Sequence, residues 1–315
     1  MKVIKNMISM KTTYIWLSVL FIIFTSGCKE EDMSMAKTDL LNKIQEVESI
    51  LLNSEEGINE GNYAPGAKSE LQTSIDWAYF ILENSFQDTA YVNAVSILDE
   101  AITNFQSNVV KAGIPNFSAG SKMNLGPCGD WKMEDCFTFE CKVRYNEFAA
   151  GDQNIISCEG GNGGWMVRSS GNIIQFYIND LGSWNGCTTS TLELNRWYHV
   201  AVSYQQGEEI SLYLDGKKVS SSPCNKLQLK SSVDLQLGTS PAYADRYMRG
   251  CIQQISLWND VRSEQEISSD VQSVFEGTEE GLEAYWPLDL NLGTEITDAT
   301  GKHIAKLSNI IWIDD

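Results

Sequence analysis

Apolar side chains between residues 33 and 111 recur three or four positions apart, and the segment holds a single proline, Pro65. This spacing puts apolar residues on one face of an α-helix and predicts three amphipathic helices. The helices are separated at residues 57–66 and 84–89, where glycine, proline or short polar residues collect. Because the connections are short and each apolar face needs a partner, we expect an up-down-up three-helix bundle over residues 37–112.

After this bundle the apolar period changes to two. Residues 137–144 alternate cleanly between apolar and polar, so their two phenylalanines share one face of a predicted strand. The pair Asp215-Gly216 lies between two further strand-like runs and is typical of a two-residue β-hairpin turn. Many short strands with turns at close intervals predict a mainly β fold, an antiparallel jelly-roll sandwich over residues 113–315, with the three-helix bundle as a separate N-terminal domain.

The first 27 residues have the pattern of a secretory signal. Three lysines precede or border an apolar run of 11 residues at 14–24. A membrane-spanning helix needs roughly 20 apolar residues, so we favour cleavage over a helix retained in the membrane. Thr-Ser-Gly-Cys at residues 25–28 resembles the bacterial lipobox. This resemblance implies that Cys28 becomes the lipidated first residue of the mature protein, with residues 28–36 as a tether.

Residues 29–32, Lys-Glu-Glu-Asp, resemble the signal that some Gram-negative bacteria use to send lipoproteins to the outer leaflet. A solvated charged tether is the other interpretation of the same run. Several acyl chains hold a protein on a membrane almost permanently, since each buried methylene contributes about 0.8 kcal/mol. We therefore expect an outer-membrane lipoprotein that is attached through Cys28 and faces the cell exterior.

The chain is acidic. Its formal net charge is −19, and loss of the signal lysines Lys2, Lys5 and Lys11 would make it −22 (−19 − 3). A surface of this charge repels phosphate backbones, so we expect no nucleic acid among the partners. The negative charge does not argue against neutral molecules as ligands.

Eight cysteines are many for a cytosolic protein and fit an oxidising compartment in which some of them pair. Lipidation of one leaves seven: Cys128, Cys136, Cys141, Cys158, Cys187, Cys224 and Cys251. They show no CxxC and no zinc-ligand spacing, and only His199 and His303 could assist. We therefore expect disulfides together with buried thiols, and no metal site. Because seven is odd, at least one cysteine stays outside any pair.

Several segments in a fixed order carry a family resemblance: residues 196–202, 210–216, 248–258, 262–267 and 281–289. Together they resemble the laminin G-like, concanavalin A-like jelly roll, over about residues 114–313. The resemblance implies a β-sandwich that recognises saccharides or proteins. The second and third predicted helices are similar to the FIVAR-type module of bacterial surface proteins. For the bundle we favour a role as a spacer over a ligand site.

The family resemblance leaves calcium as a candidate cofactor without giving it a site. Related strands usually carry an Asp-Glu pair where this chain has Gln253-Gln254. Their opening strand is often rich in aspartate, whereas residues 118–122 here are Ser-Ala-Gly-Ser-Lys. Calcium prefers several oxygen ligands, usually including carboxylates. Both departures remove carboxylates.

No catalytic residue is predicted. Glycoside hydrolases of this architecture resemble one another by a Glu-x-Asp-x-Glu strand, which this chain lacks, and glycosidic cleavage needs two carboxylates about 5–10 Å apart. His199 lies within a strand-like run and is interpreted as a framework residue, and His303 has no nearby nucleophile to activate. A glycoside hydrolase whose carboxylates come from distant loops stays open as a second alternative.

Binding is better supported, because sugar rings dock their apolar faces on aromatic side chains while amides and carboxylates bind their hydroxyls. Residues 179–185 and 240–247 combine such groups and are expected to interrupt strands. They supply seven candidate ligand-binding residues: Asn179, Asp180, Trp184, Tyr243, Asp245, Arg246 and Tyr247. For Trp184 we favour a ring that packs down, for example against a disulfide of Cys187, over a ring that binds ligand.

These patterns favour a lipid-anchored, surface-exposed, non-catalytic protein that binds a poly- or oligosaccharide. The helical bundle would lift the binding domain off the membrane. A protein-binding adhesion or scaffold module, with a surface protein as its partner, is the alternative, since laminin G-like domains bind proteins as well as sugars.

Overall fold

A computed structural model describes residues 34–161, 163–229 and 232–314 of the 315-residue chain. The predicted signal segment, Cys28 and the charged run at 29–32 lie outside the described residues. Within the described part, no helix combines the length and apolar character that crossing a bilayer requires.

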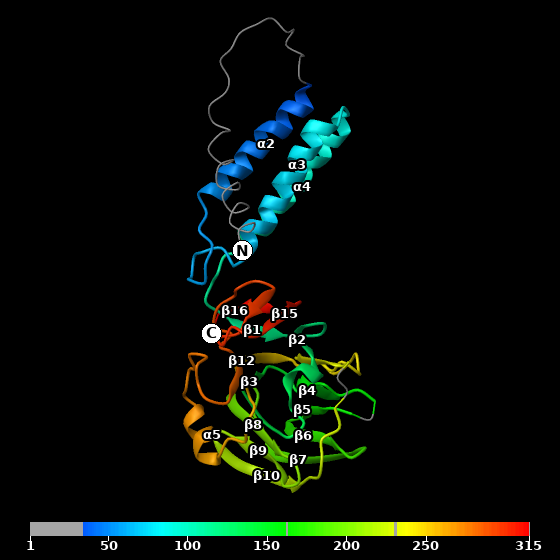
Figure 1. Ribbon diagram of the computed structural model, residues 1–315, viewed down its shortest axis with the longest axis vertical. Helices are drawn as coiled ribbons and strands as arrows, with labels where there is room; N and C mark the ends of the chain where they lie inside the picture. Colours follow the sequence, from blue (N-terminus) through cyan, green and yellow to red (C-terminus); the bar gives the residue numbers. More distant parts are fainter. Residues whose placement is uncertain (1–33, 162, 230–231, 315) are drawn as a thin grey trace, which may run out of the picture.

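Three long helices form the N-terminal part of the described chain: α2 (Met35–Leu52), α3 (Ala67–Asn84) and α4 (Asp88–Ser107). They run antiparallel to their sequence neighbours (Figure 1). Their apolar stripes meet in a core of their own, made of Leu40, Ile44, Val47, Ala67, Leu71, Ile75, Ala78, Tyr91, Ala94, Leu98, Ile102 and Phe105. The helical spacing in the sequence therefore predicted the buried faces correctly.

The long connection between α2 and α3 is folded onto the end of α4. Tyr63 stacks on Phe105, with ring centroids 4.0 Å apart. The backbone amides of Val110 and Gly61 each donate across to the other segment, to Asn62 and Val110 respectively. These contacts close the end of the bundle that faces the strands.

The remaining strands form two antiparallel sheets. The first sheet has the order β10-β9-β8-β3-β12-β1-β16, with β13 also paired to β12. Its strands are β1 (Ile114–Phe117), β3 (Cys136–Tyr145), β8 (Trp197–Gln205), β9 (Glu209–Leu214), β10 (Lys217–Pro223), β12 (Gly250–Trp258), β13 (Leu282–Trp286) and β16 (Ile311–Ile313). A short helix, α5 (Glu264–Asp270), follows β12.

The second sheet has the order β14-β15-β2-β11-β4-β5-β6-β7. Its strands are β2 (Lys122–Pro127), β4 (Asp152–Ser157), β5 (Trp165–Ser170), β6 (Ile173–Asp180), β7 (Ser183–Thr191), β11 (Asp234–Leu237), β14 (Glu295–Thr297) and β15 (Ile304–Ser308). A 3₁₀ turn, η1 (Cys128–Trp131), follows β2.

The main hydrophobic core lies between the two sheets. Trp165 of the second sheet packs against Phe137 of the first at 4.7 Å between ring centroids, and Phe176 meets both rings edge-on. Leu214 pairs with Lys217 across Asp215-Gly216, as the hairpin signal predicted. The predicted fold class, a mainly β antiparallel sandwich with a separate helical module, is confirmed.

The bundle is joined to the sandwich by a short backbone ladder. Asn291 N–H donates to the carbonyl of Lys111 at 2.9 Å, and Gly113 N–H donates to the carbonyl of Asp289 at 3.0 Å. The helices project from the end of the sandwich where β1 and β16 lie, and the dark-blue start of α2 is the end farthest from the sandwich (Figure 1).

The prediction of disulfides among the seven cysteines is wrong, since no disulfide joins any cysteines within the described ranges. The thiols sit on separate elements with other partners: Cys136 donates to the carbonyl of Asn259, Cys224 to that of Gln205, and Cys251 contacts Asn116. Cys141 and Cys187 are buried in the core. Cys128 and Cys158 are buried free thiols, and burial together with the neighbouring Cys128 raises the pKa of Cys158.

Candidate functional site

A pocket of about 330 Å³ opens on the outer face of the second sheet. Tyr177, Trp184 and Tyr243 form its aromatic walls, together with Met166, and Glu159, Arg168 and Arg246 give it a charged floor. The walls come from β5, β6 and β7, and from the loop between β11 and β12. This volume lies at the lower end of the range of about 300–1,000 Å³ for small-molecule sites.

Trp184 reaches the pocket from a strand. Residues 179–185, which we predicted as a loop that interrupts strands, are a tight hairpin in which Trp184 of β7 pairs with Asn179 of β6. The turn is only Leu181-Gly182, with φ of 52° and 94°. Two consecutive positive φ values are typical of the turn that matches the twist of a two-residue hairpin. Trp184 is 41% exposed, and Cys187 forms no disulfide, so the favoured expectation that Trp184 packs down is wrong.

Tyr177 owes its place in the wall to a glycine. Gly186 pairs with Tyr177 across β6 and β7. A Cβ added at Gly186 would lie 2.3 Å from the Tyr177 ring, closer than real carbon contacts allow. The missing side chain therefore lets the tyrosine ring lie across β7, next to Trp184, where both rings border the same pocket.

Tyr243 is held by a turn built on Ser240. The Ser240 hydroxyl accepts hydrogen bonds from the backbone amides of Ala242 and Tyr243, both at 3.1 Å, and donates to Glu159 at 2.7 Å. The Tyr243 side chain is half exposed. The guanidinium carbon of Arg246 lies 3.9 Å from the centre of its ring, a cation–π contact that fixes the ring plane.

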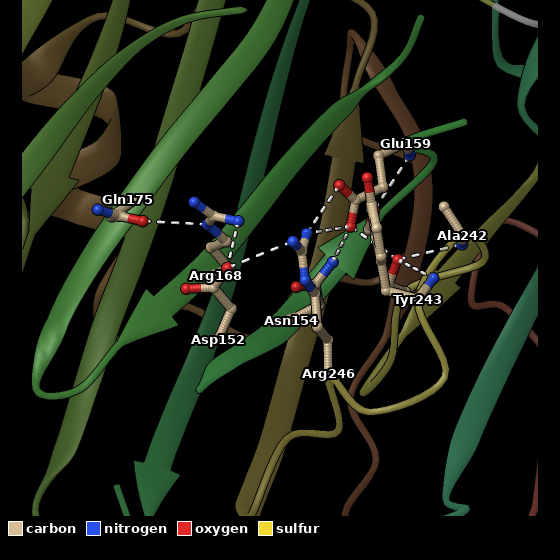
Figure 2. A network of polar contacts seen from close by, with 10 residues as sticks. Asp152, Asn154, Glu159, Arg168, Gln175, Ala242, Tyr243 and Arg246 are labelled. Carbon is tan, nitrogen blue, oxygen red and sulfur yellow. Dashed lines mark hydrogen bonds and ion pairs between the residues drawn. The ribbon is translucent and has the colours of Figure 1, made fainter. Parts of the chain in front are cut away.

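The floor of the pocket is a buried ion pair. Arg246 donates from Nη1 to both carboxylate oxygens of Glu159, at 3.1 and 3.0 Å. Glu159 is almost fully buried and its Oε1 also accepts from the side chains of Asn154, at 2.9 Å, and Ser240. Figure 2 shows Arg246 between Glu159 on one side and Asp152 on the other. A carboxylate held by this many donors fixes the guanidinium in one position.

A second arginine continues the network along the sheet. Arg168 Nη1 lies 2.5 Å from Asp152 Oδ2, and its Nε donates to Gln175 at 3.0 Å (Figure 2). Arg246 Nη2 lies 3.5 Å from the same Asp152 oxygen. Two arginines and two carboxylates therefore sum to zero charge, in a protein that is strongly acidic as a whole.

The pocket brings together three of the seven predicted ligand-binding residues, Trp184, Tyr243 and Arg246. The other four do not line it. Asn179 is buried and its Oδ1 accepts from Gly182 N–H in the hairpin turn, while Asp245 is exposed and Tyr247 half-buried.

Asp180 has a structural place instead. Its carboxylate accepts from the backbone amides of Asn225 and Lys226, at 3.0 and 2.9 Å. Burial acts to raise the pKa of this carboxyl, but these bonds outweigh it and the pKa lies below its ordinary value. Asp180 thus ties the hairpin to the segment that follows β10.

Sequence reasoning missed Glu159, Met166, Arg168 and Tyr177. One signal was present: Glu159 precedes Gly160 and Gly161, and Gly163-Gly164 follow shortly after. Glycines next to a polar residue often mark a close approach of backbone. Here a Cβ at Gly164 would lie 2.2 Å from the carbonyl oxygen of Cys158, so this turn can fold tightly enough to bury Glu159.

The two histidines lie away from the pocket, and the described residues hold no cluster of metal ligands. Across the described ranges, no group of three or more His, Cys, Asp or Glu side chains is arranged to hold a metal ion. His199 lies in β8 of the other sheet, where its Nε2 is 3.2 Å from Glu140. His303 stacks on Trp131 and contacts Glu283. Both histidines are thus part of the framework of the sandwich.

Comparison with known proteins finds a family model that matches part of the sandwich. Residues 117–268 match the family model of the concanavalin A-like lectin/glucanases superfamily, Laminin_G_3. The match is shorter than the resemblance over about 114–313 and does not reach the helices, so the FIVAR resemblance stays a prediction. No curated protein matches the chain.

Several solved structures resemble this chain at low identity. A candidate carbohydrate binding protein from Bacteroides ovatus has 21% identity and a TM-score of 0.52, over 64% of this chain and 60% of its own. A SAP-like pentraxin from Limulus polyphemus has 14% identity and a TM-score of 0.39. The match covers 52% of this chain and 82% of the pentraxin. The receptor binding domain of botulinum neurotoxin mosaic serotype C/D has 13% identity and a TM-score of 0.43. The match covers 52% of this chain and 45% of that domain's chain.

At 21% identity and a TM-score of 0.52, the feature shared with the Bacteroides ovatus protein is the fold alone. This chain spans about three fifths of the Bacteroides ovatus protein. The sheet order, the interleaved aromatic core and the match to the family model agree with one another. Through residues 117–268, this chain is therefore similar to the concanavalin A-like lectin/glucanases superfamily.

Proposed function

We propose that the protein is a lipid-anchored, surface-exposed, non-catalytic saccharide-binding protein. The observation that carries the proposal is the pocket in which Trp184 and Tyr243, both well exposed, border a floor of fixed arginines and carboxylates. Aromatic walls offer apolar faces to a sugar ring, and the fixed polar floor offers hydrogen bonds to its hydroxyls. With a volume of about 330 Å³, the pocket can hold a short stretch of saccharide.

The charge of the floor favours a neutral saccharide. Arg168 and Arg246 are already paired with Asp152 and Glu159, so an anionic sugar would gain little from them. The rest of the chain carries an excess of 19 negative charges and repels anions at a distance. Hydroxyls, which both donate and accept, can use the remaining N–H groups of the arginines without a change in net charge.

The matching family model supports saccharides as the ligand class, since its description names lectins and glucanases. The Bacteroides ovatus neighbour is a candidate carbohydrate binding protein, but at 21% identity this likeness concerns the fold alone. The assignment to saccharide therefore rests on the pocket.

The engagement of the carboxylates favours binding over catalysis. Glycosidic cleavage needs one carboxyl group that delivers a proton and a second that acts as base or nucleophile. Glu159 Oε1 already accepts three hydrogen bonds and its Oε2 a fourth, all from neighbouring side chains. Such a carboxylate is an anchor for Arg246, and it is poorly placed to exchange protons with a substrate.

Affinity electrophoresis of the full chain in detergent, through gels that contain neutral polysaccharides, tests the binding. We expect retardation by at least one neutral polysaccharide, lost in Trp184→Ala and kept in Trp77→Ala. Trp77 is a matched control because it is 38% exposed and lies on α3, away from the pocket. Equal mobility of Trp184→Ala and the parent in every retarding gel would contradict the proposed site.

Two further measurements separate the alternatives. Release of new reducing ends from a retarding polysaccharide would make the protein a hydrolase. Absence of retardation by any polysaccharide, together with stable capture of a purified surface protein, would favour the adhesion or scaffold alternative.

The anchor has its own test. Lipidation at Cys28 predicts an N-terminal peptide that carries acyl groups, which Cys28→Ala lacks. If residues 29–32 direct the protein outward, neutral replacements of all four should abolish labelling of intact cells by antibody. Unchanged labelling would leave that run as a plain tether.

A further inference from the structure

Four apolar side chains gather at one end of the helical bundle, the tip. They are Met35 at the start of α2, Phe80 near the end of α3, Phe86 in the α3–α4 connection and Val92 in the first turns of α4. All four are exposed, Phe86 at 93%. Single apolar residues on a surface are ordinary, but a group of large ones at one end of a soluble bundle marks a contact surface.

The three helices bring these residues to the same end. Lys37 of α2 lies over the ring of Tyr91 in α4, at 5.9 Å, and the Tyr91 hydroxyl donates to the carbonyl of Ser85 in the connection. The start of α2, the α3–α4 connection and the start of α4 are therefore neighbours. Figure 1 shows this end as the part of the described chain farthest from the sandwich.

The sequence places the tip next to the proposed lipid. Six residues, 29–34, separate Cys28 from Met35. Seven extended residue steps span at most about 25 Å, so a bilayer that holds Cys28 lies within reach of the tip. The sandwich lies farther from Cys28 along the chain, because the 18-residue helix α2 spans a further ~27 Å. This step rests on the proposed anchor at Cys28.

We propose that the tip, formed by Met35, Phe80, Phe86 and Val92, rests in the interfacial layer of a phospholipid bilayer as a second contact beside the lipid anchor. Apolar side chains at the end of an element enter this layer to about 5–10 Å. Glu83 and Asp88 flank the connection and Lys37 is the nearby cation, so the tip suits zwitterionic headgroups better than anionic ones.

The contact would fix the bundle upright. A lipid on a flexible tether restrains distance alone, whereas a tip that is seated in the interface also restrains direction. The pocket would then be held away from the membrane and turned toward polymers in the medium.

Quenching by lipid tests the contact in the full lipidated chain. Phe86→Trp places a fluorophore in the tip, and vesicles of dibrominated phosphatidylcholine quench tryptophan that enters the interface. The lipidated protein without the substitution supplies the background of its eight tryptophans, because Trp16 is lost with the signal segment (9 − 1). We expect the additional fluorescence to be lost in brominated vesicles and blue-shifted in unbrominated ones. Val274→Trp, at an exposed position of the sandwich, should show neither effect.

Vesicle flotation and intact mass make the outcomes distinct. Phe86→Trp protein that floats with vesicles and carries the acyl mass, yet is not quenched, would overturn the tip contact and leave the anchor standing. Cross-linked dimers through Phe86→Cys in that situation would assign the tip to a second copy. A chain that neither floats nor carries acyl groups would overturn the anchor, and the tip contact with it.

Discussion

The guanidinium of Arg246 lies 3.9 Å from the centre of the Tyr243 ring while its Nη1 donates to both carboxylate oxygens of Glu159. One arginine therefore couples the floor of the pocket to its most exposed wall. The buried Glu159 holds Arg246 in place, and Arg246 in turn holds the half-exposed ring of Tyr243. A substitution at Glu159 should therefore change the position of the Tyr243 ring.

Glu159→Gln should weaken saccharide binding about tenfold, equivalent to about 1.4 kcal/mol. Glutamine keeps the shape of the Glu159 side chain, but it removes the negative charge that holds Arg246. Its amide group would then face the Arg246 guanidinium in place of a carboxylate. Removal of one partner of a buried ion pair also costs about 3–5 kcal/mol of unfolding free energy. Titration with the retarding saccharide and urea unfolding measure the two effects.

Glu147→Gln is the matched control for this variant. Glu147 forms a pair with Arg249 at 2.9 Å, but both side chains are exposed. An exposed pair contributes little because water and salt screen it, so neither affinity nor stability should change measurably. Equal effects of the two substitutions would mean that Glu159 has no special part in the pocket.

Replacements at Tyr243 should separate the ring from the hydroxyl. Tyr243→Phe keeps the surface on which Arg246 stacks and should bind saccharide nearly as the parent does. Tyr243→Ala removes the ring and the cation–π contact, which contributes roughly 0.5–2 kcal/mol, and should weaken binding about fivefold to tenfold. Calorimetric titration of both variants checks this. A large loss in Tyr243→Phe would show instead that the hydroxyl binds the ligand.

The architecture could be predicted because its signals are local. The helical period fixes which residues of α2 to α4 are buried, and the period of two fixes the inner face of β3. Asp215-Gly216 specifies its own turn. Each of these patterns depends on residues within a few positions of one another, so a single sequence contains the information.

The pocket could be predicted only in part, since it depends on register and packing. Leu181 has a φ of 52°, which a residue other than glycine or asparagine seldom adopts, so residues 179–185 look like a loop rather than a hairpin. Glu159 and Arg246 are 87 positions apart and meet only when β4, β5 and the β11–β12 loop are in place. Trp184 and Tyr243 could be chosen because exposed aromatic rings beside polar residues are locally recognisable.

The cysteines should behave as unreactive thiols in the native protein. Burial is the largest cause that raises the pKa of Cys187 to about 12 and that of Cys224 to about 11. Because the thiolate is the nucleophile, a pKa near 12 leaves about one Cys187 in ten thousand reactive at pH 8. We expect iodoacetamide at pH 8 to label neither residue until urea is added. Peptide mass spectrometry measures the labelling, and a disulfide-linked peptide in the native sample would contradict it.

The last prediction concerns Glu140, a carboxyl buried in the first sheet. Its Oε2 lies 3.2 Å from His199 Nε2, and its Oε1 lies 3.4 Å from Nε of Arg262, which is paired more closely with Asp270. Burial raises the pKa of Glu140 above its ordinary value, and the nearby Asp270 acts in the same direction, whereas His199 and Arg262 act to lower it. Loss of solvation outweighs the effects of His199 and Arg262.

The raised pKa of Glu140 in the folded state determines how its contribution to the unfolding free energy changes with pH. Below the ordinary value of 4.5 the carboxyl is protonated in both the folded and the unfolded chain. As the pH rises from there through the folded-state pKa, the unfolded chain has already released the proton that the folded chain still holds. The free energy of unfolding contributed by Glu140 must therefore fall over this window.

Glu140→Gln removes this titration, so its unfolding free energy minus that of the parent should increase as the pH rises above 4.5. Glu209→Gln is the control of opposite sign: the bond from Lys218 lowers the pKa of Glu209, so the stability it contributes is present above 4.5 and lost as the pH falls. Its difference from the parent should become more negative as the pH rises toward 4.5. Urea unfolding of the three proteins between about pH 3 and pH 7 measures both slopes. A flat difference for Glu140→Gln above pH 4.5 would mean that His199 and Arg262 compensate the buried charge in full.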